Sequence, residues 1–297
     1  MSMTRGDQDA PFRRPKFTPA TLQQRKVSGT PITAITAYDY PTAKLVDGAG
    51  IDVILVGDSL GMAVLGYPDT LSVTMEDMLH HARAVRRGAD SSMLIADMPY
   101  GSYHVSTDES LRNAIRFIKE AGVEAVKIEG GYERVNLVRA FTDAEIPVVG
   151  HIGLTPQSLH KMGGYKVQGR SMEALDALCD SALELEQAGA IAVVLEGMPL
   201  EVAARITSSL TIPTIGIGAG VHCDGQILVF HDIFNLTFAA PAKFVRRFGD
   251  AAQFFQHGLE QYRDEVLGRT FPQDGESYHL PQGVREELDN RVDAVTA

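Results

Sequence analysis

The feature that most constrains the fold of this chain is a series of eight short apolar runs separated by longer amphipathic segments. Such alternation is typical of βα units, and runs that are apolar along their whole length indicate a parallel sheet covered on both faces. Eight such units favour a (β/α)₈ barrel over a doubly wound open sheet, which periodicity alone leaves as the alternative. The predicted strands are residues 32–38, 52–57, 92–96, 125–128, 147–150, 191–195, 214–218 and 226–230.

Helices are predicted between these runs, because the intervening segments are amphipathic and end at glycine. Thr18 followed by proline predicts the start of a short N-terminal helix over residues 18–26. Gly88, Gly122 and Gly189 each follow an apolar-periodic stretch, where a left-handed residue commonly ends a helix. The other predicted helices are residues 75–87, 107–121, 172–188, 200–209 and 250–266.

The predicted organisation is one barrel domain between two terminal segments. Residues 1–17 are mostly polar and contain two prolines, so they are interpreted as a flexible N-terminal arm. Residues 18–283 are interpreted as a single (β/α)₈ domain with an N-terminal and a C-terminal helix. Residues 284–297 are a charged tail whose composition permits disorder.

Composition excludes several classes of function. The formal charge of -11, with Lys and Arg scattered, argues against a nucleic-acid partner. No apolar run approaches the ~20 residues that cross a bilayer, and the first residues lack a signal-peptide core, so we expect a cytoplasmic protein without a membrane partner. Cys179 and Cys223 are far apart in the sequence, which argues against a disulfide framework or a thiolate zinc site.

Ionisable residues end five of the apolar runs. In a barrel these positions share the C-terminal face, where the βα loops converge and active sites form. One acid at such a position is usually a helix cap or part of a structural ion pair, but five polar ends together indicate a site. Clustered carboxylates repel one another, so a positive group is expected among them. The residues are Asp58, Asp97, Glu129, His151 and Glu196.

Lys127 and a divalent cation are the two candidates for that positive group. Lys127 precedes Glu129 by two residues, so both side chains face the same side of their strand. The lysine either forms a structural ion pair with Glu129 or also contacts a substrate carboxylate or oxyanion. An all-oxygen set of Asp58, Asp97 and Glu129 favours Mg²⁺, which leaves positions free for a chelating ligand such as a 2-oxo acid.

Two further residues have both a functional and a structural interpretation. Ser59 follows Asp58 directly, and its hydroxyl either holds a substrate carboxylate or opens a turn. His151 ends a buried run, and it either contacts the substrate or is a structural histidine. Spacing alone does not separate these interpretations.

Seven sequence strings occur in order and together carry a resemblance to a known family. They are TAYDYPTAKL, VGDSLGMAVLGY, KIEGG, GHIGLTPQS, GGYKVQGR, VLEGMP, and GIGAG followed by CDGQILVFHD. Over residues 18–248 the chain closely resembles the ketopantoate hydroxymethyltransferase family. The resemblance implies a barrel of the phosphoenolpyruvate/pyruvate superfamily type and a homodecameric assembly. It also implies transfer of a hydroxymethyl group from 5,10-methylenetetrahydrofolate to 3-methyl-2-oxobutanoate, giving 2-dehydropantoate for pantothenate and coenzyme A biosynthesis through a Mg²⁺-stabilised enolate.

The resemblance further implies a role for most of the residues at the strand ends. Glu196, in the string VLEGMP, corresponds to the proton acceptor. The implied Mg²⁺ ligands are Asp58 and Asp97, with Glu129 completing the metal shell. The implied contacts to the 2-oxo acid are Asp58, Ser59, Asp97 and Lys127.

Two other functions remain open on the residues alone. One is a folate-independent, Mg²⁺-dependent lyase or carboligase that acts on a pyruvate-like acid. The other is a non-catalytic barrel that binds a 2-oxo acid. A requirement for tetrahydrofolate separates the first from the family activity, and exchange of the carbon-3 proton separates the second from an enzyme.

Overall fold

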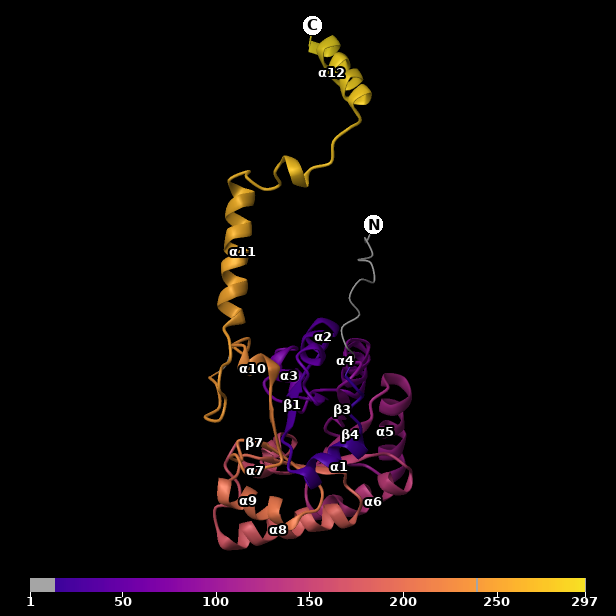
Figure 1. Cartoon of the computed structure of the whole chain (residues 1–297), viewed down its shortest axis with the longest axis vertical. Coiled ribbons are helices and arrows are strands. Elements are labelled where there is room, and N and C mark those ends of the chain that lie inside the picture. Colours follow the sequence, from indigo (N-terminus) through magenta and orange to yellow (C-terminus); the bar gives the residue numbers. More distant parts are fainter. Residues whose placement is uncertain (1–13, 239, 297) are drawn as a thin grey trace. The chain divides into compact units, whose positions relative to one another are not determined.

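The computed structural model describes residues 14–238 and 240–296, which fall into two compact units, Met1–Gly249 and Asp250–Ala297. In the first unit, eight parallel strands close into a barrel in sequence order (Figure 1). All eight predicted strands are confirmed, and closure excludes the open sheet. The strands are β1 (Ile32–Thr36), β2 (Val53–Val56), β3 (Met93–Asp97), β4 (Ala125–Glu129), β5 (Val148–Gly153), β6 (Ala192–Glu196), β7 (Thr214–Ile217) and β8 (Gly225–Leu228).

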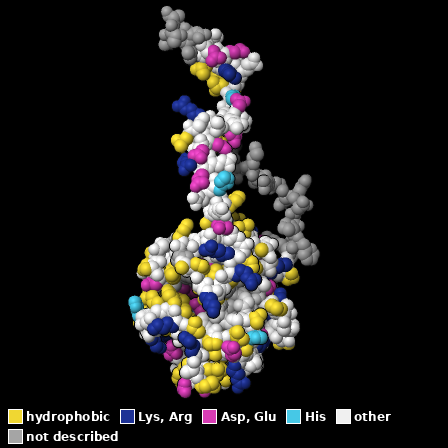
Figure 2. Space-filling view, turned by 90° about the vertical axis from the view of Figure 1, so that its left-hand side faces the viewer, with side chains coloured by type: hydrophobic (Ala, Val, Ile, Leu, Met, Phe, Trp, Pro, Cys, Tyr) yellow, Lys and Arg dark blue, Asp and Glu magenta, His cyan; other side chains and the backbone are white. Residues whose placement is uncertain are grey.

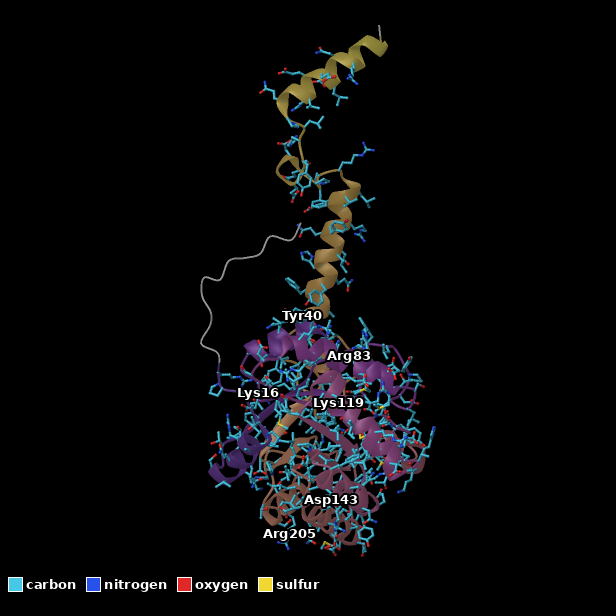
Figure 3. All side chains as sticks on the ribbon, turned by 90° about the vertical axis from the view of Figure 1, so that its right-hand side faces the viewer. Lys16, Tyr40, Arg83, Lys119, Asp143 and Arg205 are labelled. Atoms are coloured by element: carbon cyan, nitrogen blue, oxygen red, sulfur yellow. The ribbon has the colours of Figure 1, made fainter. Side chains whose placement is uncertain are left out.

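Helices surround the barrel, and the first of them begins at Thr18, the cap expected from the sequence. Thr18 accepts a hydrogen bond from the Thr21 N–H at the start of the first helix, and Ser106 caps α5 in the same way. The outer faces are polar: Arg83 of α4 and Lys119 of α5 are labelled in Figure 3, and Arg83 lies 3.4 Å from Glu120. The helices are α1 (Pro19–Ser28), α2 (Tyr40–Gly48), α3 (Leu60–Ala63), α4 (Met75–Gly88), α5 (Thr107–Ala121), α6 (Val135–Asp143), α7 (Leu159–Met162), α8 (Met172–Gln187), α9 (Leu200–Ser209) and α10 (Phe230–Ile233), with 3₁₀ turns η1 (Tyr132–Arg134) and η2 (Pro156–Ser158).

One of the three predicted helix-ending glycines has a different role. Gly122 and Gly189 have φ of 64° and 103°, the left-handed conformation that was expected. Gly88 instead remains the last residue of α4. A Cβ at Gly88 would lie 2.6 Å from the carbonyl oxygen of Tyr40, so the glycine allows α2 and α4 to approach closely.

The base of the barrel is closed by the segment around α1. Phe17 is 4% exposed and joins the apolar cluster inside the strands, together with Leu22 of α1. Lys16 lies 2.8 Å from Glu124, and Lys26 lies 2.9 Å from Asp224. The predicted flexible arm of residues 1–17 therefore differs at its end, because residues 14–17 pack on the barrel. Residues 1–13 lie outside the described part.

The C-terminal unit contains α11 (Ala251–Leu267), η3 (Asp274–Glu276) and α12 (Gln282–Thr296). The first unit ends at Gly249, and none of the residues of α11 is buried. The segment 284–297, for which the composition permitted disorder, is helical through residue 296.

On the face shown in Figure 2, basic side chains are dispersed among acidic and hydrophobic ones. Cys179 and Cys223 are both free thiols. Within residues 14–238 and 240–296, no helix combines the length and the apolar character needed to span a membrane.

Candidate active site

The residues predicted from the strand ends converge on one cavity at the C-terminal end of the barrel. Asp97, Glu129 and Glu196 are the last residues of β3, β4 and β6. Asp58 follows β2 by two residues, and His151 lies within β5. These five residues, together with Ser59 and Lys127, line a cavity of about 110 Å³. The structure therefore brings together every site residue that the sequence predicted.

Strand register explains why these side chains meet. In the pairing of β3 with β4, Asp97 lies beside Lys127. In the pairing of β4 with β5, Glu129 lies beside His151. Because inward positions alternate along a strand, Lys127 and Glu129 both point into the barrel, as predicted.

Lys127 is the central cation of the site. Its Nζ lies 3.9 Å from Glu129 Oε1, the predicted partner, and 3.1 Å from Asp97 Oδ1, a closer partner that was not predicted. The side chain is 5% exposed. Burial by itself lowers the pKa of Lys127, but the carboxylates of Asp97, Glu129 and Asp58 more than offset it and raise that pKa. The lysine is therefore charged at neutral pH.

Asp58 and Asp97 form a buried pair of acids. The Asp58 N–H donates to Asp97 Oδ2 at 3.1 Å. Burial, followed by repulsion from Asp97 and Glu129, raises the pKa of Asp58 well above its usual value. Burial also raises the pKa of Asp97, although Lys127 opposes the shift. Each carboxylate would be stabilised by additional positive charge.

His151 lies between two further acids. Its Nδ1 is 3.4 Å from Glu129 Oε1, and its Nε2 is 3.2 Å from Glu196 Oε2. Burial and the nearby Lys127 lower the pKa of His151, but the two carboxylates outweigh them and raise it to about 9. The same contacts with His151 and Lys127 outweigh burial at Glu129 and lower the pKa of that acid. Glu196 is the most exposed acid of the site, with 16% of its side chain accessible.

Sequence reasoning missed three residues of the site. The Tyr38 hydroxyl lies 2.8 Å from Ser59 Oγ, and burial raises the pKa of Tyr38. Gln157 and Tyr103 hydrogen-bond to each other beside the acids. Tyr38 and Gln157 lie inside the strings TAYDYPTAKL and GHIGLTPQS, but no periodicity or strand-end rule selects them.

The donor set is compatible with a divalent cation. When ionised, the four carboxylates of the site exceed its two cationic side chains by a formal charge of -2. Asp97 Oδ1 is buried and makes no hydrogen bond, although Lys127 lies 3.1 Å from it. In the part of the chain that the structure describes, however, no three His, Cys, Asp or Glu side chains form a ready metal-binding group. Oxygen ligands with an excess of negative charge are the groups that Mg²⁺ prefers.

Comparison of the sequence with known protein families gives a match over most of the chain. A family model described as ketopantoate hydroxymethyltransferase matches residues 16–274. This chain belongs to that family. The match covers the whole barrel and extends past the residues 18–248 on which the sequence resemblance rested.

Curated relatives named 3-methyl-2-oxobutanoate hydroxymethyltransferase support membership of the ketopantoate hydroxymethyltransferase family. The relative from Koribacter versatilis (strain Ellin345) is 58% identical, over 99% of this chain and 99% of its own length. The relative from Thermoanaerobacter sp. (strain X514) is 51% identical, over 89% of this chain and 97% of its own length. The ketopantoate hydroxymethyltransferases are transferases, which establishes the enzyme class.

Solved structures with low sequence identity to this chain share its fold. Phosphoenolpyruvate phosphomutase from Streptomyces platensis subsp. rosaceus is 17% identical with a TM-score of 0.58, over 94% of this chain and 99% of that chain. A 2,3-dimethylmalate lyase, described as a member of the PEP mutase/isocitrate lyase superfamily, is 17% identical with a TM-score of 0.54, over 94% and 99% of the two chains. This chain thus shares the barrel fold of these structures.

Proposed function

We propose that this chain transfers a hydroxymethyl group from 5,10-methylenetetrahydrofolate to 3-methyl-2-oxobutanoate, forming 2-dehydropantoate in pantothenate biosynthesis. The observation that carries the proposal is the meeting, in one cavity, of the buried acids Asp58 and Asp97, the cation Lys127 and the carboxylate of Glu196. The names of the curated relatives support the acceptor and the transferred group, and the cavity supplies groups that suit each step of the proposed reaction.

Substrate binding in this proposal depends on charge. Asp58 and Asp97 would bind Mg²⁺, and Glu129 would complete the shell of groups around the ion. When bound, the ion supplies Lewis-acid stabilisation of the negative charge that develops on the substrate's keto oxygen. Lys127 is a buried, charged donor that can hold a carboxylate or an oxyanion. The Ser59 hydroxyl can donate to the substrate carboxylate.

Glu196 is the proposed base for the carbon-3 proton. It borders the cavity and is more exposed than the other acids, so substrate can reach it. His151 Nε2 lies 3.2 Å from one oxygen of that carboxylate, so a charged His151 would hold that oxygen and leave the other for the proton. The methylene carbon's bond to one folate nitrogen first opens to give an iminium, and that nitrogen takes a proton. The electron pair of the broken C3–H bond then forms the bond from carbon 3 to the methylene carbon, while the π pair of the iminium returns to the other nitrogen. Water displaces that nitrogen: its oxygen bonds to the methylene carbon, its proton goes to the nitrogen, and tetrahydrofolate leaves.

The first test follows the product. The protein is incubated with 3-methyl-2-oxobutanoate, 5,10-methylenetetrahydrofolate and Mg²⁺, and 2-dehydropantoate is measured by mass spectrometry. Product that depends on the folate supports the proposal. Carbon-carbon bond cleavage or formation without folate would instead identify a lyase or carboligase, and 2-oxo acid binding without proton exchange would identify a non-catalytic barrel.

We further propose a homodecamer, as the family resemblance implies, and a location in the cytoplasm, as the composition predicts. Analytical ultracentrifugation of the full chain tests the assembly, and a sedimenting species smaller than ten copies would contradict it. Fractionation of cells that express the chain tests the location.

A further inference from the structure

Gln157 bonds to Asp58 and Glu129, two of the acids that line the cavity. It belongs to η2, which follows β5, and it is 5% exposed. Its side-chain Nε2 donates to Asp58 Oδ2 at 2.8 Å and to the Met98 carbonyl oxygen at 2.9 Å. Both amide hydrogens are thus used, and one of them is committed to an acid that follows β2.

Tyr103 sets the orientation of this amide. The Tyr103 hydroxyl donates to Gln157 Oε1 at 2.5 Å and accepts from the Glu129 N–H at 3.1 Å. A backbone N–H can only donate, so the hydroxyl must accept there and give its single hydrogen to the glutamine oxygen. With Oε1 held in this way, the NH₂ group of Gln157 necessarily faces Asp58. The ring of Tyr103 is buried, which keeps water from competing for these bonds.

The backbone of the same residue holds a second acid. The Gln157 N–H donates to Glu129 Oε2 at 2.9 Å. Gln157 therefore fixes one oxygen of Asp58 through its side chain and one oxygen of Glu129 through its main chain. These two acids come from different strand ends, and residue 157 is the group that bonds to both.

We infer that Gln157 is a positioning residue for cation binding: its amide orients the Asp58 carboxylate so that Oδ1 is presented to the cation. The inference rests on the proposed role of Asp58 as a ligand. A neutral donor suits this task, because it fixes the carboxylate without neutralising the negative charge that attracts the cation. A Lys or Arg at the same place would compete with the cation for that charge.

The test replaces the amide while keeping the length of the side chain. In the full-length protein, Gln157→Met removes both amide hydrogens but retains the backbone N–H that holds Glu129. Binding of Mg²⁺ and of Mn²⁺ is measured by calorimetry, without any substrate. We expect the dissociation constant to rise about tenfold, since one charge-assisted hydrogen bond to a ligand is lost. Weaker cation binding should also lower the transferase activity of the variant at limiting Mg²⁺. Added Mg²⁺ should restore most of that activity.

Two further variants make the result decisive. Gln187→Met, on the exposed end of α8, is the matched control and should bind cations as the wild type does. Tyr103→Phe removes the hydroxyl that orients the amide and should weaken cation binding in the same direction, by about threefold.

The outcomes separate this inference from the proposed function. A folded Gln157→Met variant with wild-type cation affinity overturns the inference while leaving the proposed function intact. Absence of saturable cation binding in the wild type contradicts both, and it does so before any variant is compared. If Gln157→Met does not fold, Tyr103→Phe decides: weaker binding supports the inference, and wild-type affinity overturns it.

Discussion

The two ends of the barrel interior are built from the same strands but have opposite chemistry. At the base, the inward side chains are apolar and pack with Phe17 and Leu22 from the segment around α1. At the mouth, five buried residues are ionisable and bond to one another. The change occurs along single strands: β4 supplies Ala125 to the base cluster, then Lys127 and Glu129 to the mouth.

This contrast shows that the base of the barrel stabilises the fold and that the mouth carries the reactive groups. Apolar burial at the base stabilises the fold at roughly 25 cal/mol per Å² removed from water. Buried charges at the mouth cost free energy unless each finds a partner, and the mouth acids still have raised pKa values at Asp58 and Asp97. The base therefore supports a mouth that is electrostatically strained until a cation or a substrate enters.

The largest effect is expected at the mouth of the barrel, where a substitution should slow the reaction without changing stability. Glu196→Gln removes the proposed base while leaving a side chain of the same shape, so exchange of the carbon-3 proton into D₂O should fall by about 10³-fold. The melting temperature and the binding of 3-methyl-2-oxobutanoate should change little. Proton NMR of the substrate in D₂O measures the exchange, and a rate equal to that of the wild type would remove Glu196 from this role.

The next largest effect tests whether the buried acids at the mouth need the positive charge of Lys127 for the protein to be stable. Lys127→Met leaves Asp97 and Glu129 without that charge, so the free energy of unfolding should fall by about 3–5 kcal/mol. Urea denaturation measures the loss. Added Mg²⁺ should recover part of it, because the ion replaces positive charge among the acids. A variant as stable as the wild type would show that the mouth is not strained.

A change at the base should affect stability without affecting chemistry. Leu22 is 1% exposed in the base cluster, and Leu22→Ala should lower the free energy of unfolding by about 3 kcal/mol. At a temperature where this variant is folded, its carbon-3 exchange rate should equal that of the wild type. A slower rate under those conditions would mean that the two ends are coupled.

The smallest effect concerns the bond between Tyr38 and Ser59. Tyr38→Phe removes a buried hydroxyl 2.8 Å from Ser59 Oγ, which leaves the serine less well oriented. The KM for 3-methyl-2-oxobutanoate should rise about fivefold, the equivalent of about 1 kcal/mol, with kcat nearly unchanged. Steady-state kinetics separate the two constants, and an unchanged KM would leave Ser59 without a part in substrate binding.

The sequence by itself determined the local structure and the rim of the barrel. The apolar runs predicted all eight strands, and Thr18 predicted the first helix start, because propensity and capping act over a few residues. Residues that directly end a strand, such as Asp97 and Glu196, were found because parallel strands place their ends on one face.

Only the tertiary structure decided which side chains bond to which. Asp97 is the nearer partner of Lys127 because of the register between β3 and β4, which the sequence pattern does not encode. Gln157 and Asp58 are 99 residues apart, and their bond depends on loops whose paths follow no period. Periodicity reports which face of an element is buried, whereas partners across loops are fixed only when the whole chain packs.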